Sequence, residues 1–436
     1  MKIRRPVTIA IFAGFWLSGV SAHGQSAFDL RTTLDEAPLV SNPNLTVPEE
    51  AAPRRRKAAG DPYAVTGIGT GAFRFYPSLS IGGLAASNVA GSASNPKADA
   101  GFNLKPSLRV ESDWVRHAWT AGAGGDFTYY GDNSDLNTRN VDLFQRLRLD
   151  IRRGTTAAFD SAYAQDQTGI EDSEVPASAI GYRTDHTLSS AVAVSHDLGG
   201  LEARLKSAIT WRSFGDVALP GGGKEDNSDR NYVEPTLSFR ATYSDPPVFK
   251  PYVELGFAPR IHQQNFDRNG LRRDSNGYTL SAGVVLDEGP IWSGDVALTY
   301  LRRDYEDPAL DSLQAAGLSG NLTWSPAELT RIVLSLGTTL SETSSATSPG
   351  SRNWSIGLDG NHEIRDNLEI FAGLGAGVEQ AQGGTDVTYS ADAGVSWKLN
   401  PMLAWTASYD LTWLDAAASA RDYTVHKIST GLTFSR

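Results

Sequence analysis

Apolar and polar residues alternate along most of the chain, and the alternation is clearest between Arg139 and Gly154. From position 141 to position 151 the odd-numbered residues are apolar, interrupted only by Gln145, and the even-numbered residues are charged, interrupted only by Phe144. Successive side chains of a β-strand point to opposite faces of the sheet. The pattern therefore predicts a strand with one apolar face and one charged face.

The same alternation returns in segment after segment up to Arg436, and no helix or second layer is evident that would cover the apolar faces. A closed barrel in a bilayer resolves this, because lipid covers the outer face and water fills the inside. We therefore predict an all-β protein, a closed antiparallel transmembrane β-barrel of about 18 strands, with 16 as the alternative. A soluble β-sandwich would use the same residues, but its strands rarely repeat so long and so often.

Connections between the predicted strands alternate in length. The short ones are Arg152–Thr155, Asp197–Gly200, Asp245–Lys250, Asp287–Pro290, Ser325–Glu328, Arg365–Asn367 and Asn400–Met402. The longer polar ones are Gly131–Thr138, Thr168–Gly181, Gly215–Arg230, Asn265–Asn276, Tyr305–Asp311, Ser341–Ser351 and Asp415–Arg421. Short periplasmic turns and longer outer loops are typical of bacterial barrels. We expect the Gly-rich loop Gly215–Arg230 to lie outside the barrel, with a constriction inside the lumen as the alternative.

Aromatic residues near strand ends fit the two membrane interfaces, where amphipathic rings prefer the headgroup level. The tryptophans of this kind are Trp211, Trp292, Trp324, Trp397 and Trp413. The last predicted strand, Tyr423 to Arg436, alternates in the same way and carries Phe434 close to its end. We expect the barrel-assembly machinery to recognise this strand.

The N-terminal segment predicts export. Basic residues near the start precede an apolar stretch from Val7 to Leu17 and small residues ending at Ala22, which is the arrangement of a secretory signal peptide. We assign residues 1–22 to the signal peptide with cleavage near Ala22, residues 23–66 to a disordered periplasmic arm, and residues 67–436 to the barrel. The basic cluster Arg54–Lys57 is expected to be a solvated part of the arm, with contact to anionic lipid or a lumen plug as alternatives.

A short motif opens the barrel region. In the stretch DPYAVTGIGTGAFRFYPSLSIGG, which begins at Asp61, its residues are Gly67, Ile68, Gly71, Phe73, Pro77, Ser78 and Leu79. The stretch resembles the opening of the putative β-barrel porin family of Gram-negative outer membranes, where a D/N-P-Y/F segment leads into a G-I-x-x-G-x-F-x-x-x-P-S-L strand. In outline the resemblance covers Asp61 to Arg436. It implies an outer-membrane barrel with a role in transport.

Composition narrows the function classes. The net charge of -11 argues against nucleic acid as a partner, and the absence of Cys removes disulfides. No pair among the seven His has metal-ligand spacing, and no G-x-S-x-G nucleophile motif is present. We therefore predict no metal, no cofactor and no enzymatic activity.

The charged face of the strands carries the candidate functional residues. The basic ones are Lys105, Arg109, Arg146, Arg148, Arg152, Arg204, Lys206, Arg212 and Arg240. The acidic ones come later in the chain and are Asp295, Asp359, Glu369, Glu379, Asp392 and Asp410. Our hypothesis is a lumen with a basic wall facing an acidic wall, whose transverse field favours anions along the basic side. The alternative is a salt-bridged wall that only stiffens the barrel.

These patterns favour an outer-membrane channel for the passive passage of small solutes, with a preference for anions. A barrel that exports exopolysaccharide and a structural barrel with a blocked lumen are the alternatives. The expected partners are outer-membrane lipid and lipopolysaccharide, the barrel-assembly machinery, and small solutes or polysaccharide.

Overall fold

The computed structural model describes residues 62–170, 172, 174–176, 178–289, 291–343, 345, 346 and 348–436. The predicted signal peptide, the predicted arm up to residue 61 and the Arg54–Lys57 cluster lie outside the described residues. No helix in the described part of the chain is long and apolar enough to cross a membrane.

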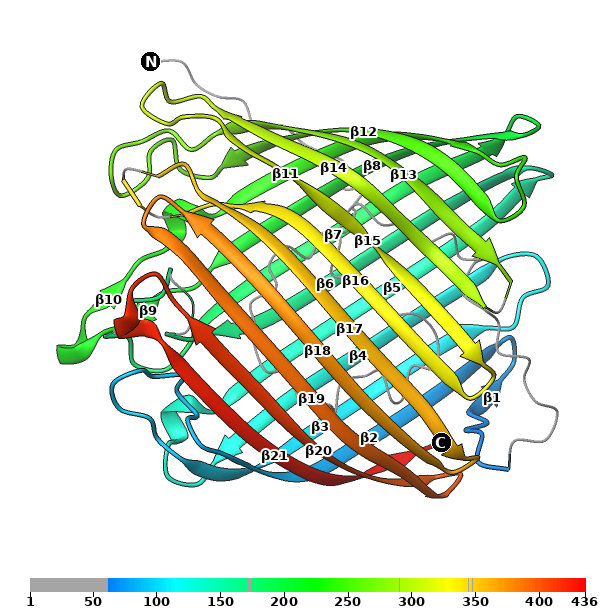
Figure 1. Ribbon diagram of the computed structural model, residues 1–436, viewed down its shortest axis with the longest axis horizontal. Coiled ribbons are helices and arrows are strands. Elements are labelled where there is room, and N and C mark those ends of the chain that lie inside the picture. Colours follow the sequence, from blue (N-terminus) through cyan, green and yellow to red (C-terminus); the bar gives the residue numbers. More distant parts are fainter. Residues whose placement is uncertain are drawn as a thin grey trace.

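Antiparallel strands form a single sheet that closes on itself as a barrel, with the strands tilted against its long direction (Figure 1). The sheet contains 19 strands, of which the short β1 (Ile68–Thr70) pairs only with β2, so the closed ring has 18 strands. The ring consists of β2 (Phe73–Ala86), β3 (Asp99–Ser112), β4 (Ala118–Tyr130), β5 (Thr138–Arg152), β6 (Thr155–Thr168), β7 (Arg183–Asp197), β8 (Leu201–Phe214), β11 (Tyr232–Tyr243), β12 (Phe249–His262), β13 (Ser275–Glu288), β14 (Trp292–Tyr305), β15 (Leu313–Ala327), β16 (Thr330–Ser341), β17 (Ser351–Arg365), β18 (Leu368–Ala381), β19 (Gly384–Asn400), β20 (Leu403–Asp415) and β21 (Tyr423–Ser435).

Each strand of the ring pairs with its neighbours in the chain, and the last strand pairs with the first. The closing pair sets Leu79 of β2 opposite Phe434 of β21. Closure leaves no unpaired edge within the ring, which is the condition for a sheet to span a bilayer. The predicted all-β barrel and the predicted count of about 18 strands are confirmed.

The outer face of the barrel is apolar, as the alternation predicts. Large apolar side chains stay exposed at alternate positions, for example Leu143, Leu149 and Ile151 on β5. Aromatic pairs cross between neighbouring strands on this face: the rings of Trp292 and Trp324 stack at 5.4 Å. Lipid rather than a second layer of protein must therefore cover this surface.

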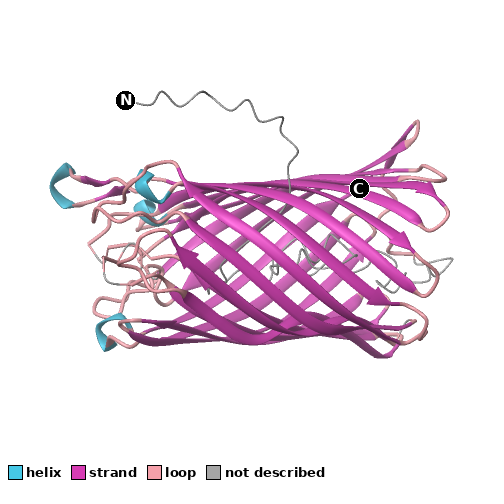
Figure 2. Cartoon of the chain, turned by 90° about the horizontal axis from the view of Figure 1, so that it is seen from above, coloured by secondary structure: helices cyan, strands magenta, loops and turns pink. Residues whose placement is uncertain are grey.

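The two ends of the barrel differ. Tight turns lie at the end that also carries the C-terminus, whereas the opposite end carries the longer loops (Figure 2). In the part of the chain that the structure describes, the outer loops contain four short 3₁₀ turns and one small hairpin. These are η2 (Ser134–Leu136), η3 (Pro220–Gly222), η4 (Ser228–Arg230), η5 (Ser419–Arg421), β9 (Val217–Ala218) and β10 (Lys224–Glu225). The alternation of loop lengths fails at β18–β19, which are joined on the outer side by only residues 382 and 383.

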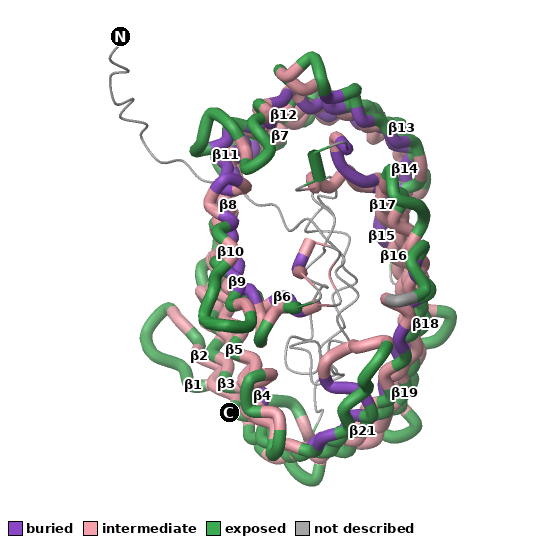
Figure 3. The backbone as a smooth tube through the Cα atoms, turned by 90° about the vertical axis from the view of Figure 1, so that its left-hand side faces the viewer, coloured by how far each residue is buried: buried purple, intermediate pink, exposed green. Residues whose placement is uncertain are grey.

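Seen along the barrel, the ring is flattened, with β12 and β13 at one narrow end (Figure 3). Glycines permit close backbone contacts in this arc. Gly294 on β14 and Gly320 on β15 have positive φ, and a Cβ at Gly320 would lie 2.3 Å from the carbonyl oxygen of Asp295. A small buried cluster of Tyr252, Val285 and Ala297 lines the inside of the same arc.

Candidate functional site

Every residue of the two predicted walls occupies an inner-face position, alternating with the exposed apolar positions of its strand. The basic residues lie on β3 (Lys105, Arg109), β5 (Arg146, Arg148, Arg152), β8 (Arg204, Lys206, Arg212) and β11 (Arg240). The acidic residues lie on β14 (Asp295), β17 (Asp359), β18 (Glu369, Glu379), β19 (Asp392) and β20 (Asp410). The two sets thus belong to separate arcs of the ring, β3 to β11 and β14 to β20. Their joint action as a transverse field stays a prediction.

Most of the basic side chains have acidic partners on their own or an adjacent strand. The pairs are Lys105–Asp126 at 2.8 Å, Arg109–Glu111 at 3.2 Å, Arg146–Asp160 at 3.0 Å, Arg148–Asp150 at 3.1 Å and Arg212–Asp185 at 4.0 Å. Arg152 donates a hydrogen bond to the hydroxyl of Thr155 at 3.2 Å. The opposite charges of such a pair largely cancel at longer distance, so the pair contributes little to an electric field across the lumen.

Arg240 and Asp295, which the sequence assigned to opposite walls, are in direct contact. The guanidinium of Arg240 lies 2.7 Å from Glu254 and 3.5 Å from Asp295, and it stacks 3.9 Å over the ring centroid of Tyr252. The hydroxyl of Tyr252 donates a hydrogen bond of 2.6 Å to the same Asp295 carboxylate. Arg240 and Asp295 are three strands apart, and the sharp curvature of the wall between β11 and β14 brings them together.

Arg204 and Lys206 on β8 differ from the other basic residues. Within the described part of the chain, neither makes a hydrogen bond or an ion pair. Arg204 is directly opposite Arg240 in the β8–β11 register, and Lys206 is opposite Ser238. Together with Arg152, whose partner is a neutral hydroxyl, these two side chains are the predicted basic residues without an acidic partner among the described residues.

Two outer connections that start on opposite sides of the ring meet inside it. The β6–β7 and β16–β17 connections are separated by six strands in one direction (β8 and β11 to β15) and by eight in the other (β18 to β21 and β2 to β5). The hydroxyl of Thr343, from β16–β17, donates a hydrogen bond of 2.6 Å to the carboxylate of Glu174, from β6–β7. Described pieces of both connections lie within the ring in Figure 3. We call this contact the outer constriction.

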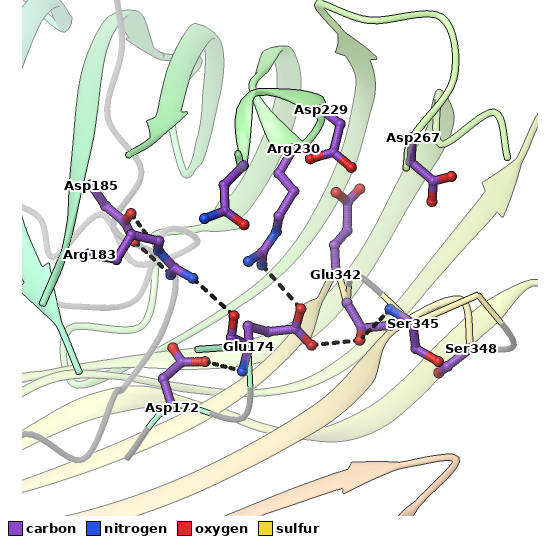
Figure 4. Close-up of polar contacts among 12 residues, drawn as sticks. Asp172, Glu174, Arg183, Asp185, Asp229, Arg230, Asp267, Glu342, Ser345 and Ser348 are labelled. Atoms are coloured by element: carbon purple, nitrogen blue, oxygen red, sulfur yellow. Dashed lines mark hydrogen bonds and ion pairs between the residues drawn. The ribbon is translucent and has the colours of Figure 1, made fainter. Parts of the chain in front are cut away.

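Two arginines, Arg230 in the β8–β11 loop and Arg183 at the start of β7, hold the β6–β7 side of the outer constriction (Figure 4). The guanidinium of Arg230 lies 3.6 Å from the Glu174 carboxylate and 4.5 Å from the ring centroid of Phe214. Arg183 donates to the backbone oxygen of Glu174 at 3.4 Å and forms a bidentate pair with Asp185 at 2.8 Å. Arg183 is only 2% exposed, so the connection is fixed to a rigid part of the wall.

A second group of side chains holds the β16–β17 side. The Glu342 carboxylate lies 2.8 Å from Arg260 and 3.0 Å from His262, both on β12. Arg273, from the β12–β13 loop, donates to the backbone oxygens of Ser345 and Ser348. The hydroxyl of Tyr305 donates to the backbone oxygen of Pro349 at 2.5 Å. The connection is therefore attached to the wall at both ends.

The charge state of Glu342 follows from these neighbours. Burial alone would raise the pKa of the Glu342 carboxyl, but Arg260, His262 and Arg303 outweigh it and hold the pKa well below its usual range. Glu342 is thus an anion at every physiological pH, and its ion pairs with the wall persist.

A recess in the inner wall lies next to the β16–β17 attachment. It encloses about 970 Å³ of empty space, part of it open to solvent. On its lumen side it is lined by Lys206, Thr210, Glu234, Thr236, Glu254 and Arg260. Glu234 is shared by Arg260 at 2.7 Å and Arg303 at 2.8 Å, and all three residues are buried.

The sequence did not reveal the outer constriction. We considered only Gly215–Arg230 as a loop that could enter the lumen, and the structure places most of it outside as the β9–β10 hairpin (Figure 1). The connections that do enter were predicted only as long polar loops. Their acidic anchors Glu174 and Glu342 have partners up to 169 residues away in the chain, and no local pattern signals such contacts.

Comparison with known families agrees with this geometry. The model of the family described as putative beta-barrel porin 2 matches residues 61–436. The chain belongs to this family. The resemblance inferred from the opening motif is therefore confirmed, and this porin family member is an outer-membrane β-barrel with a porin-like transport role.

Solved structures give more distant likenesses to this porin family member. The outer membrane protein OpdK from Pseudomonas aeruginosa has a TM-score of 0.40 and 12% identity, over 83% of this chain and 99% of that one. OpdL from Pseudomonas aeruginosa has a TM-score of 0.41 and 11% identity, over 83% of this chain and 99% of that one. The siderophore receptor PirA from Acinetobacter baumannii has a TM-score of 0.40 and 8% identity, over 83% of this chain and 80% of that one. Among curated proteins, no sequence matches the chain.

Proposed function

We propose that this barrel is a passive channel for small solutes with a preference for anions, narrowed near its outer end by the outer constriction. The observation that carries the proposal is the contact between Thr343 and Glu174. An 18-stranded ring is too wide for wall side chains alone to fill. Two connections that cross it from opposite sides reduce its width without requiring a separate plug domain.

The local pairing of most inner charges supports size selection with a modest preference for anions. Arg204 and Lys206 supply positive charge that no described carboxylate neutralises. A fixed positive charge beside the path raises the local concentration of anions and lowers that of cations.

Planar-bilayer recording tests this proposal. We expect ohmic steps in symmetric KCl, and a reversal potential in a KCl gradient that indicates a moderate excess of Cl⁻ over K⁺. The absence of steps from a correctly folded barrel would instead favour the structural barrel with a blocked lumen. A current that depends on added acidic oligosaccharide would favour polysaccharide export.

The processing and partners of the protein complete the proposal. Residues 1–22 act as a signal peptide cleaved near Ala22, and residues 23–66 as a periplasmic arm. The C-terminal strand is recognised by the barrel-assembly machinery, and outer-membrane lipid and lipopolysaccharide surround the barrel. N-terminal sequencing of the outer-membrane form tests the cleavage position; an intact Met1 would contradict it.

A further inference from the structure

We infer that the recess between β8 and β16 is a binding subsite for a small organic monocarboxylate, centred on the ammonium group of Lys206. The inference rests on the proposed channel function, because a solute must reach the lumen to enter the recess. It goes further by naming the residues that hold the solute and the chemical group that they hold.

Charged side chains line the recess. Its lumen side carries the cations Lys206, Arg260 and Arg303 and the carboxylates Glu234 and Glu254. Glu234 is taken by Arg260 and Arg303, and Glu254 by Arg240 at 2.7 Å. No described carboxylate lies within ion-pair distance of Lys206. The recess thus presents one cation without a protein counter-ion.

Two hydroxyl groups also line the recess. The hydroxyls of Thr210 and Thr236 are buried and make no hydrogen bond within the described part of the chain. Thr210 is only 3% exposed. Buried polar groups are normally hydrogen-bonded, so an unpaired hydroxyl that faces a recess indicates a missing partner. A carboxylate has two oxygens and accepts several hydrogen bonds, which one ammonium group and two hydroxyls can supply.

Small and apolar residues surround the charged group of Lys206. On β7, the inner-face residues opposite the recess strand are small: Ala193 pairs with Lys206 and Ala191 with Ala208. Leu301 and Tyr232 also line the recess and offer apolar surface to a short carbon chain. One unpaired cation beside apolar surface favours a monocarboxylate over a dianion, which would bring an uncompensated second charge.

The test measures binding without current. The purified full-length barrel in detergent is titrated with butyrate and, separately, with the neutral isostere butyramide, and binding is followed by ligand-observed NMR. We expect saturable binding of butyrate and no binding of butyramide. In Lys206→Met the affinity for butyrate falls about tenfold or more, the factor expected from one lost hydrogen bond to a charged group. Lys206→Arg retains binding, and Thr210→Val weakens it.

Lys250→Met is the matched control, because Lys250 also faces inward but is paired with Asp287 at 2.6 Å; it leaves binding unchanged. Equal binding of butyrate and butyramide, or undiminished binding of butyrate by Lys206→Met, overturns the subsite. If Lys206→Met does not fold, Thr210→Val and Lys206→Arg decide in the same assay. A barrel that binds butyrate but conducts no current refutes the channel function and leaves the subsite intact. A barrel that conducts current but does not bind butyrate refutes the subsite and leaves the channel function intact.

Discussion

Substitution of Arg273 tests whether the β16–β17 connection narrows the lumen. Arg273 is 5% exposed, donates to the backbone oxygens of Ser345 and Ser348, and pairs with Asp267 at 2.9 Å. Methionine at this position keeps much of the side-chain volume and removes every donor. We expect Arg273→Met to release the C-terminal half of the connection from the wall while the ring itself stays closed.

The size of the effect follows from the hydrogen bonds that are lost. A hydrogen bond that involves a charged group contributes about 1.5–3 kcal/mol. Losing both bonds to the connection therefore shifts its equilibrium toward the released state by about 3 kcal/mol or more, which is on the order of a hundredfold. Glu342 still holds the N-terminal end through Arg260 and His262, so complete displacement is not expected.

Single-channel recording in a planar bilayer measures this change. We expect Arg273→Met to show a larger main conductance, or frequent transitions to a larger level, and to admit larger neutral polymers than the unmodified barrel. Arg272→Met is the control, because the neighbouring Arg272 forms a solvent-exposed pair with Glu306 and such pairs contribute little. A folded Arg273→Met barrel with unchanged conductance and unchanged polymer exclusion would refute the assignment of the constriction.

Three further predictions concern the wall and its charges. Arg240→Leu leaves the fully buried Asp295 and its neighbour Glu254 without the cation of Arg240, and breaking a buried pair in this way costs about 3–5 kcal/mol. A heat-modifiability gel should therefore show unfolding of the barrel at a clearly lower temperature, and an unchanged unfolding temperature would contradict the contact. Gly320→Ala forces a Cβ to 2.3 Å from a backbone oxygen and should destabilise the barrel by about 1–3 kcal/mol, while Gly377→Ala, where the nearest atom is 3.9 Å away, should be neutral in the same gel. Because the pKa of Glu342 is lowered, its ion pairs are fully present above the ordinary pKa of a glutamate and are lost only as the pH falls through the depressed pKa of the folded protein. Conductance should therefore not increase between pH 7 and about 4.5, which is close to the ordinary pKa of a glutamate. An increase within that window would contradict the ion pairs between Glu342 and β12.

The alternation of apolar and polar residues was sufficient to predict the barrel, because lipid and water impose a period of two on every strand. On β5 only Gln145 and Phe144 interrupt this alternation, so both the position of the strand and the residues on its inner face could be predicted. The pairing of inner charges was not predictable in the same way. Arg240 and Asp295 meet because of how the ring curves between β11 and β14, and strand alternation specifies a face without specifying curvature.

The outer constriction was beyond sequence reasoning for a related reason. Periodicity carries no information where the chain leaves the sheet, and Thr343 meets Glu174 only because two connections turn inward from opposite sides. The Gly-rich loop Gly215–Arg230 contributes its last residue, Arg230, to this contact. Glycine content indicated flexibility of the backbone, whereas the direction of a loop depends on charged anchors elsewhere in the ring.

Several side-chain contacts inside the barrel join strands that are not neighbours: Arg240 on β11 reaches Asp295 on β14, and Arg303 on β14 reaches Glu234 on β11. Backbone hydrogen bonds between adjacent strands keep the ring of strands closed but allow its cross-section to change between circular and elliptical. The side-chain contacts between non-adjacent strands restrict that change. The pore of this porin should consequently keep its elliptical outline when lateral pressure or bilayer thickness changes, and its permeability should depend little on the lipid in which it is reconstituted.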